Sequence, residues 1–180
     1  LTVSRLVPEK GLLYILEALA PLLRSQPTLE FHVLGDGPME SHLRRRADQL
    51  DIGDSVAFLG TVTHEQVPKV LSDADVFVNH AVGNSHWEEF FGVANLEAMA
   101  CGVPPVVSDS GGIPYSIRRE GVAKVVTERS VVDLRAAIRE LVENPDEREV
   151  LGEQARDYVV DTYAIERIGD RYHKLVTDEI

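Results

Sequence analysis

Short hydrophobic runs alternate with longer segments of helical periodicity over most of the chain. The runs are bounded by Gly, Pro, Asp or Ser and predict buried strands at 1–6, 29–34, 55–59, 76–79, 105–108 and 123–126. Between them, apolar residues recur at i, i+3 and i+4, which predicts helices at 11–25, 38–50, 65–72, 92–100 and 113–118. This alternation is typical of βαβ units, so we predict an α/β fold, a Rossmann-like three-layer α/β/α domain with about six parallel strands.

The last third of the chain has no strand-like run and predicts a helical tail. Helices are expected at 131–143, 146–162 and 165–178, with breaks at Asn144-Pro145 and near Tyr163-Ala164. A length of 180 residues suits one hydrophobic core, so we expect a single domain over 1–180. The first six residues resemble a strand cut open at its start, not a signal peptide.

Composition and charge narrow the function classes. The chain is 44% hydrophobic and 27% charged, and no run approaches the ~18 apolar residues that a membrane span needs. The formal net charge of −12 argues against a nucleic-acid partner, which normally requires a basic patch. The single cysteine, Cys101, allows no internal disulfide and no zinc-type spacing, so we expect a reducing, cytoplasmic location.

The predicted topology directs attention to the loops that follow strands. In a doubly wound parallel sheet, ligands bind beyond the carboxyl ends of the strands. The loops at 4–10, 35–38, 60–64, 80–91 and 109–112 should therefore face one rim. Their Gly, Asp, Glu and basic residues are the candidates for binding and chemistry.

Two cations lie in the first of these loops. Arg5 follows the first strand and Lys10 opens the first helix, so a diphosphate would fit between them and the helix N-terminus. The alternative is surface charge flanking a turn. Gly35-Asp36-Gly37-Pro38 begins like a dinucleotide fingerprint, but Glu40 replaces the third glycine and Pro38 lacks an N–H, so we interpret the glycines as a tight turn that lets another ligand or domain come close.

Two carboxylates, Glu89 and Glu97, flank a probable loop-to-helix junction at Gly92. If a helix begins near Gly92, its free N–H groups face a ligand and Glu97 lies about 7.5 Å further along the axis. Glu97 sits in an otherwise small and apolar helix, so it either faces solvent at the rim or bonds a polar ligand. The pair suits a polyhydroxylated ligand. Ser110-Gly111-Gly112 offers a second glycine-rich turn whose amides could approach oxyanions.

Other motifs in the chain resemble metal-binding, hydrolase or nucleotide-binding motifs but are incomplete or misplaced. Asp73-Ala74-Asp75 has metal-binding spacing but precedes a strand, at the rim opposite the expected site. His80 and His86 lack zinc-type spacing, and Gly83-Asn84-Ser85-His86-Trp87 ends a would-be nucleophile elbow in tryptophan. No P-loop occurs. We expect no metal site and no nucleotide hydrolase of that class.

Taken together, the motifs resemble the carboxyl-terminal half of family-4 glycosyltransferases of GT-B fold. They occur in order over nearly the whole chain: Ser-Arg-Leu-x-Pro-Glu-Lys-Gly, Gly-Asp-Gly-Pro, Phe-Leu-Gly, Ala-Asp-Val-Phe-Val, Glu-x-Phe-Gly-x-x-x-x-Glu-Ala-Met-Ala-Cys-Gly-Val-Pro and Ser-Asp-x-Gly-Gly-Ile-Pro. The resemblance implies retaining transfer of a sugar from a UDP-, GDP- or ADP-sugar without an essential metal.

The resemblance also implies roles for particular positions. Arg5 and Lys10 would hold the diphosphate and stabilise the charge that develops on it as the glycosidic bond breaks. Glu89, the first glutamate of the family's E-x7-E motif, would contact the donor sugar, and Glu97, the second, the ribose hydroxyls. Backbone amides would reach sugar or phosphate oxygens at Phe91, Gly92 and Val93, and a loop would border the base at Gly60, Thr61 and Val62.

The chain departs from the family pattern at two positions and lacks the family's N-terminal domain. The family often has glycine after the first glutamate and glutamate after Gly-Gly-Ile-Pro, where this chain has Phe90 and Tyr115. Phe90 is placed to crowd the sugar, which leaves the donor open. The family's N-terminal domain, which binds the acceptor, is absent from this chain, so the fragment alone should transfer little sugar.

Cellular context and function class remain alternatives at this stage. Through the N-terminal domain, peripheral attachment at the inner membrane face stays open, with a saccharide or lipid-linked acceptor. A sugar-nucleotide epimerase of the same fold and a non-catalytic nucleotide-sugar-binding module also remain.

Overall fold

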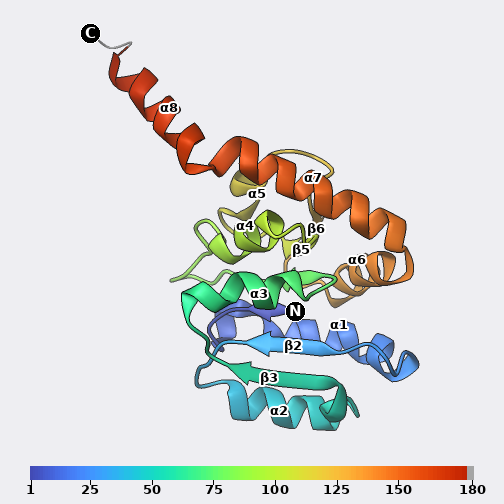
Figure 1. Ribbon diagram of the computed structural model, residues 1–180. Coiled ribbons are helices and arrows are strands. Elements are labelled where there is room, and N and C mark those ends of the chain that lie inside the picture. Colours follow the sequence, from blue (N-terminus) through green and yellow to red (C-terminus); the bar gives the residue numbers. More distant parts are fainter. Residues whose placement is uncertain (178–180) are drawn as a thin grey trace.

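The structure, a computed structural model, describes residues 1–177 and contains two three-stranded parallel sheets, ordered β1-β2-β3 and β4-β5-β6 (Figure 1). The sheets meet where β1 lies beside β4. There the nitrogen of Leu1 donates to the carbonyl of Val76 over 2.9 Å, and the amide of Val78 donates to the carbonyl of Leu1 over 2.8 Å. The strands are β1 (Thr2–Val3), β2 (Phe31–Leu34), β3 (Val56–Gly60), β4 (Phe77–Asn79), β5 (Pro105–Ser108) and β6 (Lys124–Val126).

The strand order across the molecule is therefore 3-2-1-4-5-6. The chain winds outward from β1 to β3, returns to the centre at β4, and winds outward again to β6. The direction of winding reverses between β1 and β4, so the loops after these two strands lead to helices on opposite faces of the sheet, and we call the place between these loops the crevice. In open parallel sheets ligands bind at this reversal.

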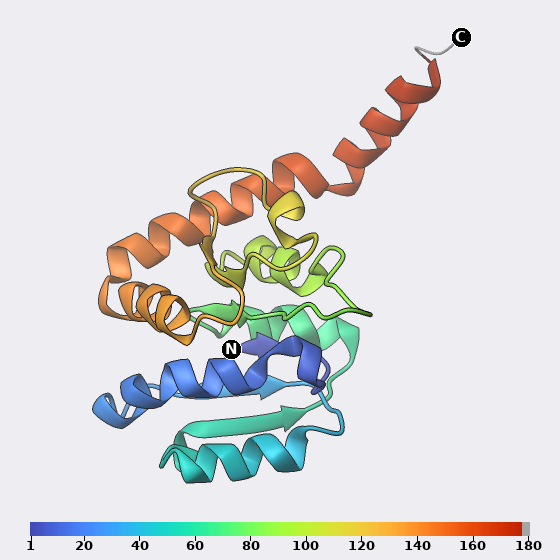
Figure 2. The ribbon, with the colours of Figure 1, turned by 180° about the vertical axis from the view of Figure 1, so that it is seen from behind.

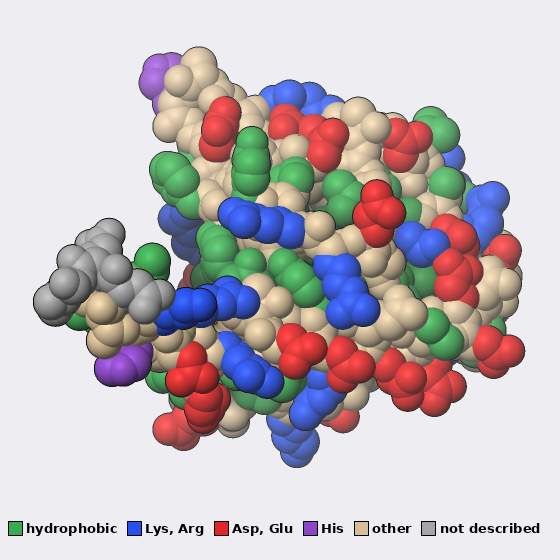
Figure 3. Space-filling model, turned by 90° about the horizontal axis from the view of Figure 1, so that it is seen from above, with side chains coloured by type: hydrophobic (Ala, Val, Ile, Leu, Met, Phe, Trp, Pro, Cys, Tyr) green, Lys and Arg blue, Asp and Glu red, His purple; other side chains and the backbone are tan. Residues whose placement is uncertain are grey.

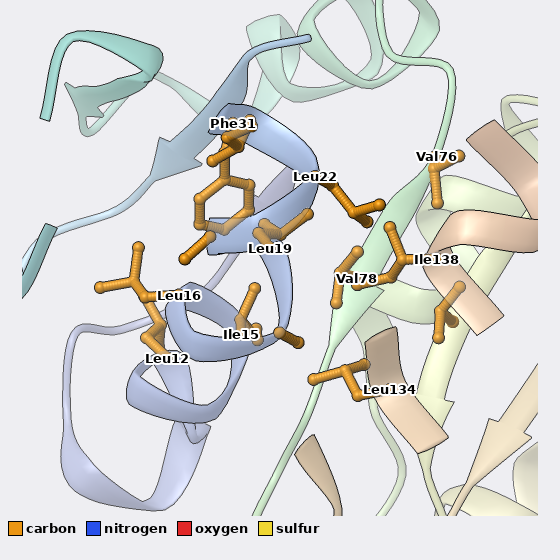
Figure 4. Packing of buried hydrophobic residues seen from close by; sticks show 14 of the residues in the cluster. Leu12, Ile15, Leu16, Leu19, Leu22, Phe31, Val76, Val78, Leu134 and Ile138 are labelled. Atoms are coloured by element: carbon orange, nitrogen blue, oxygen red, sulfur yellow. The ribbon is translucent and has the colours of Figure 1, made fainter. Parts of the chain in front are cut away.

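Side chains around β4 alternate between two helical layers, as the pleat of a strand requires. Val76 and Val78 pack with residues of α1 and α6 (Figure 4), whereas Phe77 packs on the opposite face with Leu71 of α3 and Ala98 of α4. The predicted three-layer α/β/α architecture is confirmed. The helices are α1 (Leu12–Ser25), α2 (Glu40–Gln49), α3 (Val67–Ser72), α4 (Val93–Ala100), α5 (Ile113–Ser116), α6 (Val131–Glu143), α7 (Pro145–Tyr163) and α8 (Ile165–Thr177).

The largest hydrophobic cluster is centred on α1, which buries apolar residues on most of its turns. Figure 4 shows Ile15, Leu19 and Leu22 directed toward Leu134 and Ile138 of α6 and toward the β4 valines. Burial of each such side chain contributes roughly 1.5–3 kcal/mol. This packing fixes α1 at the centre of one helical layer. Its N-terminus therefore lies at the crevice between β1 and β4.

Most predicted elements occur within one or two residues of their expected bounds, and the differences concern β1, Pro38 and α5. β1 is much shorter than 1–6: beyond Val3, the amides of Ser4 and Leu6 still donate to the carbonyls of Leu34 (3.0 Å) and Asp36 (2.6 Å), and Pro8 then begins a 3-10 helix, Pro8–Lys10. Pro38 lies in the turn before α2, not inside the helix as predicted. The predicted helix over 113–118 is only the four residues of α5. Asp178, the predicted end of the tail, lies outside the described residues.

α8 projects away from the rest of the molecule (Figures 1 and 2) and buries no residue. Its apolar side chains, Ile165, Ile168, Tyr172, Leu175 and Val176, are all exposed. Figure 3 shows this end of the molecule from above, where acidic and basic side chains alternate over the surface. No helix within residues 1–177 combines the length and apolarity that crossing a membrane would need.

Gly152 of α7 lies in close contact with the turn after α4. A Cβ there would lie 2.2 Å from the carbonyl oxygen of Gly102, just after α4. We expect Gly152→Ala to lower the free energy of unfolding by about 1–2 kcal/mol, because overpacking costs about 1–3 kcal/mol and helix propensity returns at most about 1 kcal/mol. Urea unfolding measures the change. Gly169→Ala in α8, where a Cβ meets nothing within 4 Å, is the matched control and should cause no loss; equal losses would contradict the packing.

Candidate functional site

The crevice between β1 and β4 is closed at its base by a backbone contact that only glycine permits. Gly11 caps the 3-10 helix and opens α1 with a φ of 61°. A Cβ at Gly11 would lie 1.9 Å from the carbonyl oxygen of His80, the residue after β4. The first turn of α1 therefore lies directly against the end of β4, and residues from the first and fourth strand-to-helix loops meet.

Lys10 and Glu89 form an ion pair in this crevice. The Nζ of Lys10 donates to Oε2 of Glu89, and the two side chains are only 16% and 14% exposed. The same ammonium lies 5.1 Å from the centroid of the Trp87 ring. A cation and a carboxylate that are 79 residues apart in sequence are thus held together in a largely desolvated place. This arrangement can present positive charge to phosphate and a carboxylate to hydroxyl groups.

The loop that carries Glu89 enters α4 through Gly92, whose φ is 71°. A Cβ there would lie 2.4 Å from Nδ2 of Asn95, which is itself held by a 2.7 Å hydrogen bond from Asn79 to its Oδ1. The start of α4 has no side-chain cap. Within residues 1–177 the amides of Phe91, Gly92 and Val93 donate no hydrogen bond, so they can serve an anionic or hydroxylated ligand.

The aromatic residues of this loop take different positions. Phe90 is 88% exposed and points away from the body, so in this structure it does not fill the crevice as its place in the motif suggested. Phe91 packs edge-on against Tyr163 at the end of α7, with ring centroids 5.6 Å apart. Tyr115, the second departure from the family pattern, is also exposed.

Arg5 lines a second hollow, on the β2–β3 side of the crevice. Thr61 and Val62 line the same cavity of about 220 Å³, and Gly60 precedes them at the end of β3 with a φ of 69°. Glu97 lies on α4 with its side chain 30% exposed, and its Oε1 is 4.0 Å from Nδ1 of the exposed His64. Among residues 1–177, no hydrogen bond or ion pair joins this group to the Lys10–Glu89 pair.

The two glycine-rich turns have other tasks than the sequence suggested. The amide of Gly112 donates to the carbonyl of Glu89 over 2.6 Å, so it seats the Glu89 loop and is not available to an oxyanion. A Cβ at Gly112 would lie 1.8 Å from the carbonyl oxygen of Phe90. At Gly35 a Cβ would lie 1.9 Å from the carbonyl oxygen of Ser4. The chain's own 4–6 segment therefore comes close to the Gly-Asp-Gly turn.

His80 and two residues after β6 form a network that sequence reasoning missed. The amide of Arg129 donates to Nε2 of His80 over 3.0 Å, and Glu128 and Arg129 both contact Gly83. The loop at 127–130 is a sixth strand-to-helix loop, and the topology rule that selected the other five would have found it. No group of three or more potential metal ligands occurs within residues 1–177.

His80 is fully buried, and burial lowers its pKa from 6.5 to about 4, against the opposing effect of Glu128 and Asp109. In the folded state Nε2 accepts a hydrogen bond, so protonation would break that bond and bury a charge. The unfolded state binds the proton more readily between pH 4 and 6.5. The stability that neutral His80 provides is therefore complete above pH 6.5 and is lost as the pH falls toward 4.

We expect the wild-type chain to lose about 2 kcal/mol of unfolding free energy through His80 between pH 7.5 and 5. His80→Gln keeps an acceptor for the Arg129 amide but does not titrate, so its pH profile should be flatter by that amount. Urea unfolding at both pH values measures the difference. His42→Gln, at an exposed position of α2, should keep the wild-type slope. An unchanged slope in His80→Gln would contradict the assignment.

Residues 1–158 match the family described as "Glycosyl transferases group 1". The GDP-mannose-dependent monoacylated alpha-(1-6)-phosphatidylinositol monomannoside mannosyltransferase of Corynebacterium glutamicum is 33% identical over 179 residues, which are 98% of this chain and 46% of that protein. The alpha-D-kanosaminyltransferase of Streptomyces kanamyceticus is 29% identical over 171 residues, covering 95% of this chain and 43% of that protein. The chain thus spans about half the length of the curated relatives that it matches.

Solved structures share the fold. Anabaena Alr3699/HepE in complex with UDP has a TM-score of 0.85 at 22% identity and covers 98% of this chain and 48% of its own. The C-terminal domain of a glycosyl transferase group 1 family protein, LpcC from Francisella tularensis, has a TM-score of 0.81 at 21% identity and covers 91% of this chain and 85% of its own. The shared fold and the sequence similarity to this family both agree with the resemblance to GT-B enzymes. The chain belongs to the group 1 glycosyl transferases.

Proposed function

We propose that this chain is the donor-binding half of a retaining glycosyltransferase, which moves a sugar from a nucleoside diphosphate sugar to a saccharide or lipid-linked acceptor. The observation that carries the proposal is the Lys10–Glu89 ion pair at the crevice between β1 and β4. Sequence similarity alone would allow a degenerate site. A desolvated cation and carboxylate on this rim supply the two charges that an activated sugar requires.

The donor would lie along the rim with its diphosphate over the start of α1. Lys10 and the exposed Arg5 would neutralise the diphosphate, and the free amides at the start of α4 would bond its oxygens or the sugar. Negative charge grows on the diphosphate as the bond to the sugar breaks. Cations and N–H groups that are already in place stabilise that state more than the ground state, and this difference accelerates the reaction without a metal.

The sugar end and the nucleoside end of the donor would be bound by different side chains. Glu89 would accept hydrogen bonds from hydroxyls of the sugar, and Glu97, further along α4, from those of the ribose. The hollow lined by Arg5, Thr61 and Val62 would hold the base. Glu89 is paired with Lys10 in this structure. Binding of the diphosphate would draw the ammonium toward phosphate and leave the carboxylate free for the sugar.

GDP-mannose is the first donor to test, because the Corynebacterium relative is named as GDP-mannose-dependent. UDP-glucose is the second, since Alr3699/HepE was crystallised with UDP-glucose. The name of the Corynebacterium relative also specifies a phosphatidylinositol mannoside as acceptor, which favours a lipid-linked acceptor. The acceptor would be bound by the other half of the protein, since the chain spans about half of such relatives.

Titration of GDP-, UDP- and ADP-sugars into the chain by calorimetry tests the assignment. We expect Lys10→Ala to weaken binding of the preferred donor about tenfold to a hundredfold, because it removes a charge-assisted contact to phosphate. Glu97→Ala should weaken it about tenfold through lost bonds to the ribose. Lys174→Ala, an exposed lysine of α8, is the matched control and should leave affinity unchanged. Wild-type affinity in both site variants would remove the proposed roles.

A further inference from the structure

The loop at 80–91 carries Glu89 but has little regular structure of its own. Its only strand-like pairing is a single bridge between Asn84 and Trp87, within residues 1–177. At one end, Glu89 and Trp87 meet Lys10 in the crevice. The position of Glu89 therefore depends on what fixes the other end of the loop, which is Gly83.

Both backbone polar groups of Gly83 are held by neighbouring residues of the β6–α6 loop. The amide of Gly83 donates to Oε1 of Glu128 over 3.1 Å, and its carbonyl accepts from the guanidinium of Arg129. An ion pair of 2.6 Å between Arg129 and Glu128 closes the ring. An acid and a base adjacent in sequence thus hold the two backbone polar groups of one residue, and we call this arrangement the Gly83 clamp.

The Gly83 clamp is itself anchored to the sheet. The amide of Glu128 donates to Oδ1 of Asp109 over 2.7 Å, and the amide of Arg129 donates to the buried His80 over 3.0 Å. Its contacts therefore join the loops after β4, β5 and β6. The clamp can therefore hold Gly83 in a fixed position relative to the sheet, because His80 and Asp109 directly follow β4 and β5.

The backbone of Arg129 indicates that this geometry is specifically required. Its φ is 62°, in the left-handed region that side chains other than Gly, Asn and Asp rarely adopt. Within residues 1–177, Asp51 is the other residue besides glycine with a positive φ, and it lies before β3, at the opposite edge of the sheet. Glycine would suit position 129 better for the backbone alone. The arginine side chain is 52% exposed, so it contributes little to the core.

A short hairpin connects the Gly83 clamp to the crevice. The amide of Asn84 donates to the carbonyl of Trp87 over 2.8 Å, and Oδ1 of Asn84 accepts from the amide of His86 over 2.8 Å. These bonds fix the path between Gly83 and Trp87. Glu89 follows two residues later, so displacement of Gly83 moves Trp87 and Glu89 with it.

We propose that Glu128 and Arg129 are positioning residues: they fix Gly83 and, through the hairpin at 83–87, place Glu89 beside Lys10 where the donor sugar is bound. The inference rests on the proposed function for its sugar-binding consequence. Its structural part, that the Gly83 clamp orders the loop, stands independently. Neither residue touches the donor in this arrangement, so their effect is on the sugar end of the ligand alone.

The first experiment uses Trp87, the chain's only tryptophan, as a reporter. In Arg129→Gly the strained backbone is relieved while the grip on Gly83 is lost. We expect the melting temperature to stay within about 4 °C of wild type, because relief of the left-handed φ offsets the lost bonds. The acrylamide quenching constant of Trp87 should rise about twofold as the loop opens. Asp51→Gly makes the same backbone change at the far edge and should leave quenching unchanged.

The second experiment compares a nucleoside diphosphate with its sugar-bearing form. Arg129→Gly and Glu128→Gln should weaken binding of the sugar nucleotide about tenfold, since the carboxylate that meets the sugar is misplaced. Affinity for the free diphosphate, which Arg5 and Lys10 of the first loop mainly hold, should stay within about twofold. Arg129→Lys should restore part of the lost affinity, because a cation can still reach the carbonyl of Gly83.

The outcomes separate the two proposals. Unchanged quenching in Arg129→Gly, or increased quenching with wild-type affinity for the sugar nucleotide, overturns the positioning role. Equal losses for the free diphosphate and the sugar nucleotide also overturn it, because they indicate general damage to the site. If the wild-type chain binds no sugar nucleotide, the proposed function fails, and the quenching comparison alone decides whether the Gly83 clamp orders the loop.

Discussion

The contact of Gly11 with the carbonyl of His80 is the constraint on which the site depends. A Cβ in that place would overlap the oxygen at 1.9 Å, so any other residue would push α1 away from β4. With glycine, the first turn of α1 lies against the end of β4, and Lys10 reaches Glu89. The charged pair, the Trp87 contact and the crevice all follow from this one close approach, because each requires the two loops to touch.

At several glycines on this rim, two segments of the chain come into close contact. Gly35 admits the 4–6 segment, Gly92 accommodates Asn95, and Gly112 seats the backbone of Phe90. At Gly11, Gly35 and Gly112 the missing side chain lets two segments lie in contact, and these contacts join the four loops after β1, β2, β4 and β5. Conformational freedom matters at Gly11 and Gly92, whose φ values of 61° and 71° other residues would adopt only under strain.

Charge is distributed along the rim in a way that matches a long, asymmetric ligand. The Lys10–Glu89 pair occupies the crevice, while Arg5 and Glu97 lie toward β3. Burial makes the crevice pair less sensitive to salt than an exposed pair. The Gly83 clamp adds a second acid-base pair that acts on the backbone instead of on a ligand. The rim thus has one ion pair at the proposed donor site and another that holds its own loops.

The amino-acid sequence by itself determined the order of strands and helices, the residues that make the core, and the candidates Arg5, Lys10, Glu89 and Glu97. These follow from periodicity and from motifs that are local in the chain, so no knowledge of contacts is needed. Only the tertiary structure decided that Lys10 pairs with Glu89, that Gly112 supports a loop instead of an anion, and that Glu128 and Arg129 grip Gly83. Those contacts join residues 23 to 79 positions apart, and their partners are chosen by how the loops pack above the sheet. Local sequence carries no record of that packing.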